Sequence, residues 1–198
     1  MMNIITWNPC VEVESANGTR EVSLYTRQLM NRNVFIQGEI NAELANNIMT
    51  QLMYLAKESD EEINIFINSN GGEVTSGLLI YDLIREIKTP VNMYCTGMAA
   101  SMAAVLLAGG QKGRRFILPH SKTMIHEPLI AGGVGGSASS IKTISTSILE
   151  TKDIISGIWA KHTGKTIEEI NEATAFDNYM NAEESVKFGL CDAIKVPL

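Results

Sequence analysis

Cysteine is scarce in this 198-residue chain, and its three copies are widely separated. Cys10, Cys95 and Cys191 form neither a CxxC pair nor a Cys/His cluster, which argues against a metal site and against a disulfide framework. We therefore expect a reducing compartment and, most simply, the cytoplasm. The N-terminus lacks a basic start followed by a long apolar run, so no secretory signal is predicted.

Positive charge is also in short supply. The chain has 16 Lys and Arg residues against 22 Asp and Glu residues, a formal net charge of −6. An acidic chain without a basic stripe is a poor match for a nucleic-acid backbone or an anionic membrane, and we expect neither as a partner. The length and a hydrophobic content of 45% predict one domain with its own core.

Long uncharged runs are limited to residues 89–111, a stretch that is about long enough to span a bilayer. Alanine and glycine dilute its hydrophobicity, so a buried strand followed by a buried helix is the better interpretation. Ser101 lies just past the predicted junction, in the pattern Gly-x-Ala-Ala-Ser-Met-Ala. Small neighbours suit a sharp turn that presents a nucleophilic serine, although serines at helix starts are usually simple capping residues.

Short apolar runs alternate with helical periodicity from residue 34 to residue 108. The predicted strands are 34–36, 63–67, 91–96, 115–118 and 123–125, and the predicted helices are 21–31, 41–55, 75–87, 101–108 and 137–162. Capping boxes at Thr166 and Asn181 open two further helices. This alternation predicts an α/β fold whose core is a parallel sheet of βαβ units.

In such sheets, functional sites form at the carboxyl ends of strands. Gly71-Gly72, Ser101 and His126 each follow a predicted strand. His126 could serve as the general base for Ser101, and N–H groups of the Gly71-Gly72 pair and of Met102 could form an oxyanion hole. The alternatives are a structural histidine and an ordinary turn.

Other groups are weaker candidates. His120 and His162 fit surface positions better than a catalytic site. Residues 133–138 match G-x-G-x-x-A, but no good strand precedes them, so a hinge is preferred to a dinucleotide site. Spacing alone leaves open which acid would partner a catalytic histidine, and the candidates are Asp153, Glu172, Asp177 and Asp192.

The predicted helix 137–162 has isoleucines seven residues apart, at 141, 148 and 155 and again at 144 and 158. Such a seam is typical of a contact between helices, so we predict a projecting helix that forms an oligomer. The alternative is an ordinary helix packed on its own domain.

Four motifs in order resemble the proteolytic subunit of ATP-dependent Clp proteases, over roughly residues 11–196. They are Asn68-Ser69-x-Gly71-Gly72, Gly97-x-Ala99-Ala100-Ser101-Met102, Met124-Ile125-His126-x-Pro128, and Phe176 to Ala182 followed by Phe188-Gly189-Leu190-x-Asp192. The resemblance implies a serine endopeptidase with Ser101 as nucleophile, His126 as general base and Asp177 as the orienting acid. It also implies Gly71 and Met102 as oxyanion donors, with no metal and no cofactor.

The resemblance further implies a crotonase-like fold, with a flexible N-terminal axial segment (1–20), a protease domain (21–198) and a "handle" helix at about 133–162. Two stacked seven-membered rings would enclose the active sites. An AAA+ unfoldase, which uses the ATP, would deliver unfolded polypeptides and dock in apolar clefts near Phe66 and Tyr94.

Three positions depart from the family's pattern. Asn70 replaces the usual proline, Glu127 the usual glutamine, and Asn178 an arginine that contributes to contacts between rings. The departures leave open a phage-type capsid-maturation protease. A non-catalytic ring subunit and an acyl-CoA hydratase on the related fold are further alternatives.

Overall fold

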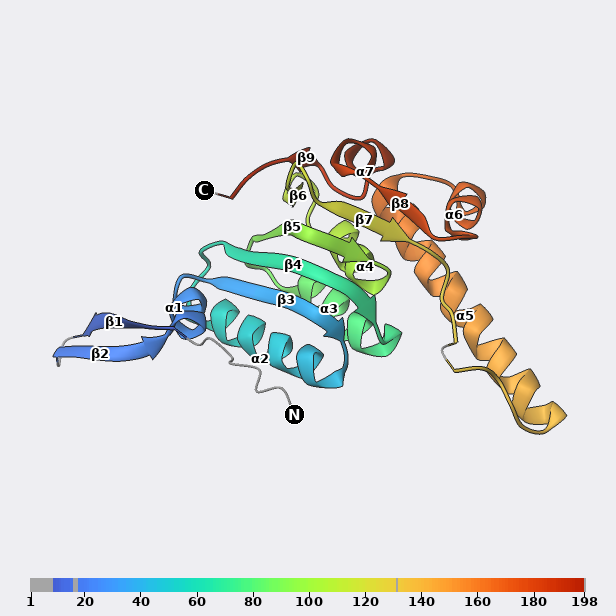
Figure 1. Ribbon diagram of the computed structural model, residues 1–198, viewed down its shortest axis with the longest axis horizontal. Coiled ribbons are helices and arrows are strands. Elements are labelled where there is room, and N and C mark those ends of the chain that lie inside the picture. Colours follow the sequence, from blue (N-terminus) through green and yellow to red (C-terminus); the bar gives the residue numbers. More distant parts are fainter. Residues whose placement is uncertain (1–8, 16–17, 131, 198) are drawn as a thin grey trace, which may run out of the picture.

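A computed structural model describes residues 9–15, 18–130 and 132–197 (Figure 1). Its central sheet has parallel neighbouring strands in the order β3-β4-β5-β6-β9. These strands are β3 (Asn33–Ile40), β4 (Ile63–Gly72), β5 (Val91–Ala100), β6 (Arg115–Ile117) and β9 (Ala193–Ile194). The predicted α/β class and mostly parallel sheet are confirmed.

Three helices cover one face of this sheet, namely α2 (Ala42–Glu58), α3 (Val74–Glu86) and α4 (Met102–Gly109), which lie side by side (Figure 1). Side chains alternate between the two faces of a strand. Ile65 and Ile67 of β4 are therefore fully buried in the core with Ile48 and Leu52 of α2, whereas Phe66 lies outside that cluster. The apolar faces predicted for the helices thus pack on the sheet.

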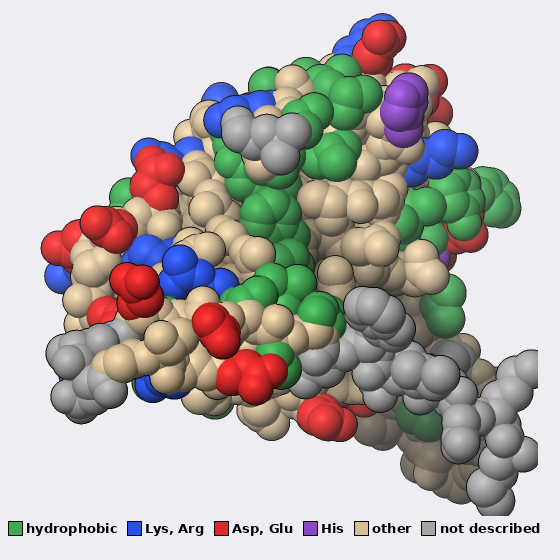
Figure 2. All heavy atoms as spheres, turned by 60° about the vertical axis from the view of Figure 1, so that its left-hand side comes forward, with side chains coloured by type: hydrophobic (Ala, Val, Ile, Leu, Met, Phe, Trp, Pro, Cys, Tyr) green, Lys and Arg blue, Asp and Glu red, His purple; other side chains and the backbone are tan. Residues whose placement is uncertain are grey.

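The opposite face of the sheet carries a row of aromatic rings. Phe66 stacks on Phe35 at 5.2 Å and on Tyr94 at 5.3 Å between ring centroids, and Tyr94 stacks on Phe116 at 5.1 Å. Figure 2, which brings forward the β1–β2 side of Figure 1, shows hydrophobic side chains gathered in a band across the molecule. The strands β1 (Cys10–Ser15) and β2 (Gly18–Ser23) form a separate antiparallel pair, which α1 (Leu24–Met30) follows.

A second group of elements extends the sheet beyond β5. The strand β7 (Lys122–Ile125) pairs with the end of β5 and, in antiparallel fashion, with β8 (Asn178–Met180). The helices α6 (Ile167–Thr174) and α7 (Ala182–Phe188) begin with the two predicted capping boxes, which are confirmed.

The predicted long helix is α5 (Ala138–Thr163), with 26 residues. Its C-terminal half buries Ile155 and Trp159, whereas its N-terminal half projects away from the body and exposes Ile141 and Leu149 (Figure 1). The seven-residue seam therefore anchors the helix to its own domain at one end and reaches out at the other.

Several predicted boundaries are wrong. Residues 21–23, predicted as helix, belong to β2, and β4 and β5 continue to Gly72 and Ala100 instead of stopping at residues 67 and 96. The strands β8 and β9 were missed. The boundary at residue 20 stays a prediction, and residues 1–8 and 16–17 of that N-terminal segment lie outside the described residues.

Candidate active site

Ser101 sits at the sharp junction between β5 and α4. Its backbone has φ +53° and ψ −124°, a conformation that is rare for any residue other than glycine. The surrounding hydrogen bonds hold it there, because the Ser101 N–H donates to Met124 O at 2.9 Å and the Ser101 carbonyl accepts from Ala104 N at 3.0 Å and Val105 N at 3.1 Å. A strained strand-to-helix turn of this kind presents the serine hydroxyl outward.

Gly71, at the end of β4, packs directly against this turn. A Cβ atom at Gly71 would lie 2.7 Å from Ala100 O and 2.8 Å from Ser101 Cβ, and its φ is +92°. Both the space and the backbone conformation therefore require glycine at this position.

His126 follows β7 and reaches Ser101. The pairing of Ala100 with Met124 places the residues after β5 and β7 side by side, and His126 Nε2 lies 2.8 Å from Ser101 Oγ. The imidazole is 16% exposed. It is thus mostly sheltered and within hydrogen-bonding distance of the hydroxyl.

Asp177 precedes β8, and the β7–β8 register brings it to His126. Because Ile125 pairs with Asn178 in an antiparallel ladder, the residues one step further on, His126 and Asp177, face each other. His126 Nδ1 lies 3.0 Å from Asp177 Oδ1. Since a carboxylate only accepts, Nδ1 carries the proton, which leaves Nε2 of a neutral imidazole to accept from the Ser101 hydroxyl. Asp177 is 56% exposed, so this end of the chain of hydrogen bonds is open to solvent.

The two predicted oxyanion donors lie on either side of Ser101. Met102 opens α4, where the first N–H groups of a helix have no intrahelical acceptor. The Gly71 N–H, in contrast, donates to Ser69 Oγ at 3.0 Å, and Ser69 Oγ donates to Gly38 O at 2.5 Å. The Gly71 N–H is therefore bound within the strand ends in this structure.

The family model of the Clp proteases matches residues 16–197 of the chain. The chain belongs to the Clp protease family. Members of this family are serine-type peptidases, which hydrolyse peptide bonds. The family also implies oligomeric assembly and, in general, cooperation with Clp unfoldases.

His120, His162 and Asp192, which the sequence also offers as candidates, do not take part in the hydrogen bonds that join Ser101, His126 and Asp177. His162 Nε2 is bonded to the Tyr81 hydroxyl at 2.8 Å, and burial lowers the His162 pKa to about 4. Asp192 forms a bidentate ion pair with Arg115, at 2.5 and 3.0 Å. His120 is exposed, as predicted.

The buried thiols are unsuited to nucleophilic chemistry. Burial raises the pKa of Cys95 to about 11 and that of Cys191 to about 12, so both stay protonated at neutral pH. Cys10 is exposed on β1. Within the described residues, no group of three or more His, Cys, Asp and Glu side chains could hold a metal ion, and no helix is long and apolar enough to cross a membrane.

Two of the departures from the family's pattern make contacts that the sequence did not reveal. Glu127 forms an ion pair with Lys152 of α5, which links the projecting helix to the residue beside His126. The Asn178 side chain donates to Ala173 O at 3.0 Å, so it caps the C-terminal end of α6, which lies just before Asp177 in the chain. Residues 126–130, which precede the glycine-rich segment, form no strand, and this agrees with a connecting segment before α5 and not with a dinucleotide-binding turn.

Proposed function

We propose that this chain hydrolyses peptide bonds through Ser101, His126 and Asp177. The observation that supports this proposal best is the continuous chain of hydrogen bonds from Asp177 Oδ1 through the imidazole to Ser101 Oγ. This arrangement supports the roles of nucleophile, base and orienting acid, because a serine-protease triad is recognised by geometry and roles and not by order along the chain.

In the first step, Ser101 Oγ attacks the scissile carbonyl while His126 Nε2 takes the hydroxyl proton. The imidazolium then returns this proton to the leaving amine, which departs and leaves an acyl-enzyme. In the second half, His126 deprotonates a water molecule, which hydrolyses the ester and restores Ser101. Asp177 stabilises the imidazolium in both halves. These steps use only groups of the protein and water, so no cofactor is invoked.

We further propose that backbone N–H groups on both sides of Ser101 stabilise the oxyanion. The Met102 N–H supplies one donor, and the Gly71–Gly72 pair the other. The Glu73 N–H donates to Ile40 O of β3, and alternate N–H groups of a strand point to opposite sides. The Gly72 N–H is therefore directed toward β5 and Ser101, whereas Gly71, the donor predicted from sequence, would first have to release Ser69 Oγ.

The proposed assembly is a pair of stacked seven-membered rings that receives unfolded polypeptides from an AAA+ unfoldase. The projecting half of α5, which exposes Ile141 and Leu149, supports contacts between rings. Phe66 supports docking, because it lines a cavity of about 580 Å³ with Leu24, Tyr25 and Phe35. Tyr94 is 5% exposed and would act by supporting the aromatic stack, not by direct contact.

The Ser101→Ala variant tests the proposal. We expect kcat for fluorogenic peptides to fall by a factor on the order of 10⁶, as in other triads, and fluorophosphonate labelling to disappear. Ser147→Ala, which removes an exposed serine of α5, is the matched control and should retain both signals. A Ser101→Ala protein that cleaves like the parent would disprove the assignment. A parent protein that is neither labelled nor active would instead indicate the non-catalytic ring subunit.

A further inference from the structure

A polar groove of about 600 Å³ lies between the carboxyl ends of β3 and β4. Its lining residues are Gly38, Glu39, Asn68, Ser69, Asn70, Gly71 and Gly72. The groove borders the proposed active site, because Gly71 is the residue that packs against the Ser101 turn. A peptide held at Ser101 therefore passes this groove or enters it.

Glu39 determines the charge of the groove. Among the described lining residues it is the one charged side chain, and the others offer only backbone, amide or hydroxyl groups. Glu39 is exposed and forms no salt bridge with any of the described residues. Glu73, which follows the Gly71–Gly72 pair, does not line the groove, and its carboxylate accepts from Ser76 Oγ of α3. The negative charge of the groove therefore comes from Glu39.

The strand register allows the distance between Glu39 and Ser101 to be estimated. Glu39 pairs with Gly71, and paired strands lie about 5 Å apart. Adding the direct contact of Gly71 with Ser101 places the Glu39 backbone roughly 10 Å from the nucleophile, which an extended peptide covers in about three residues. A side chain within this distance of the scissile bond can meet the Glu39 carboxylate.

We propose that Glu39 makes the protease prefer substrates with lysine or arginine within about three residues of the scissile bond. A long cationic side chain has the length to reach the carboxylate along the groove and the donors to bond it. The polar lining gives an apolar side chain no comparable gain. This inference rests on the proposed peptidase function and adds a specificity to it.

Matched fluorogenic peptides test the preference on the assembled protein. Each pair differs only by arginine against citrulline, a nearly isosteric neutral side chain, at one of the three positions on either side of the scissile bond. For the parent we expect kcat/KM to favour arginine by roughly two- to fivefold at one position, the range of an exposed ion pair. The ratio should fall at high salt.

Two variants decide the origin of this preference. Glu39→Gln should bring the arginine-to-citrulline ratio close to one while citrulline peptides are cleaved as by the parent. Glu43→Gln removes an exposed carboxylate of α2 that does not line the groove, and it should leave the ratio unchanged. A parent ratio near one at every position, or a ratio that survives Glu39→Gln, would overturn the proposal. If the parent protein shows no Ser101-dependent cleavage of any peptide, the proposed peptidase function fails as well. Failure of the specificity proposal alone leaves cleavage intact and changes only the arginine-to-citrulline ratio, so the two failures can be distinguished.

Discussion

At the scale of single residues, the geometry of the site depends on the backbone conformation of Ser101. An L-residue at φ +53° is unfavourable by roughly 1–3 kcal/mol, and such strain persists only where the surroundings enforce it. Here β7 supplies a hydrogen bond to the Ser101 N–H, and α4 supplies two to its carbonyl. The residue that aims the hydroxyl at His126 is therefore held by backbone from two neighbouring elements, and its own side chain remains available for chemistry.

Gly71→Ala tests how closely this turn is packed. The added Cβ would meet Ala100 O and Ser101 Cβ at 2.7 and 2.8 Å, so either the turn or the strand end must move. Because small displacements at reacting groups are costly, we expect kcat to fall by at least about 10²-fold. Gly157→Ala on α5 is the control, since its new Cβ meets open space and should leave kcat unchanged. Peptidase assays with circular dichroism separate misplacement from unfolding, and undiminished activity of Gly71→Ala would contradict this packing argument.

We predict that the folded protein loses stability in mild acid because of His162. Burial, followed by the charges of Arg85, Lys161 and Arg115, lowers its pKa from 6.5 to about 4, so the folded protein favours the neutral ring bonded to Tyr81. The contribution of His162 to stability is fully present above about pH 6.5 and is lost as the pH falls toward 4. Thermal unfolding of the parent should therefore shift to lower temperature across this range.

The His162→Gln variant, which has no titrating ring, should show a smaller shift over the same range. Asp192 does not interfere in this window: burial alone would raise its pKa, but the hydrogen bonds from Arg115 lower it below 3.8. Its own contribution is lost only at more acidic pH. Equal shifts in the parent and in His162→Gln would assign the acid sensitivity to another group.

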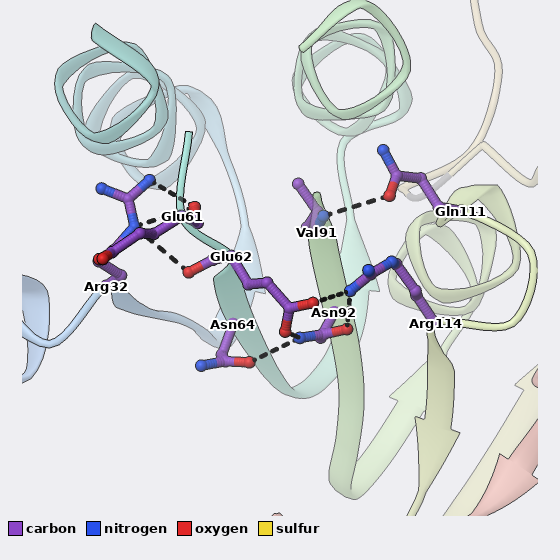
Figure 3. A network of polar contacts seen from close by, with 8 residues as sticks. All are labelled: Arg32, Glu61, Glu62, Asn64, Val91, Asn92, Gln111 and Arg114. Atoms are coloured by element: carbon purple, nitrogen blue, oxygen red, sulfur yellow. Dashed lines mark hydrogen bonds and ion pairs between the residues drawn. The ribbon is translucent and has the colours of Figure 1, made fainter. Parts of the chain in front are cut away.

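At the scale of elements, the amino-terminal ends of the strands are tied together by two arginines of unequal burial (Figure 3). The Arg32 guanidinium is buried and donates to the carbonyls of Leu55, Ser59, Glu61 and Glu62, which fixes the end of α2 to the start of β4. Arg114 instead pairs with the exposed carboxylate of Glu62 at 2.6 Å. The two positions therefore form a natural comparison.

Arg32→Met should destabilise the fold by about 2–4 kcal/mol, because four backbone carbonyls in buried or partly buried hydrogen bonds lose a charged donor. Arg114→Met should cost about 1 kcal/mol or less, as is usual for exposed ion pairs. Chemical denaturation of both variants measures the difference. Equal losses would show that burial of Arg32 does not make its hydrogen bonds stronger than those of Arg114.

Among the elements, sequence patterns were sufficient to predict the buried helices but not the ends of the strands. Long apolar periods, such as that of Ile48, Leu52 and Leu55 in α2, predict a buried helix correctly, because a single face supplies the burial. The carboxyl ends of β4 and β5 were missed, since Gly71, Gly72 and the alanines before Ser101 have low strand propensity. Tertiary pairing with β3 and β7 decides their conformation, and no local pattern records such pairing.

Neither spacing nor periodicity could identify Asp177 as the partner of His126. Residues 178–180 form a strand of three residues that exists only because β7 pairs with it, so periodicity offers no signal for it. Spacing left four acids open, and only the resemblance to the Clp protease family pointed to Asp177. The contact with His126 then follows from register: a shift of one residue in the β7–β8 ladder would turn Asp177 to the opposite face.

At the scale of the whole molecule, α5 connects assembly to the site. Its C-terminal half is part of the core, and Lys152 near its middle pairs with Glu127 beside His126. The N-terminal half leaves large apolar side chains in solvent, at Ile141 and Leu149. Exposed apolar side chains on a projecting helix are typical of a protein contact surface, and in a Clp protease a second copy of the chain is the partner to test first.

Leu149→Asp tests this contact. Leu149 is 57% exposed in the isolated chain, so aspartate there should leave the folded subunit intact but place a charge in any contact between copies of α5. We expect native mass spectrometry to show the largest assembly of the parent divided into smaller ones, with thermal stability of the subunit itself changed by less than about 0.5 kcal/mol. Leu149→Met keeps the apolar volume and should assemble as the parent does. An unchanged assembly in Leu149→Asp would mean that this half of α5 is not the contact, because a buried, unpaired carboxylate costs too much to be tolerated there.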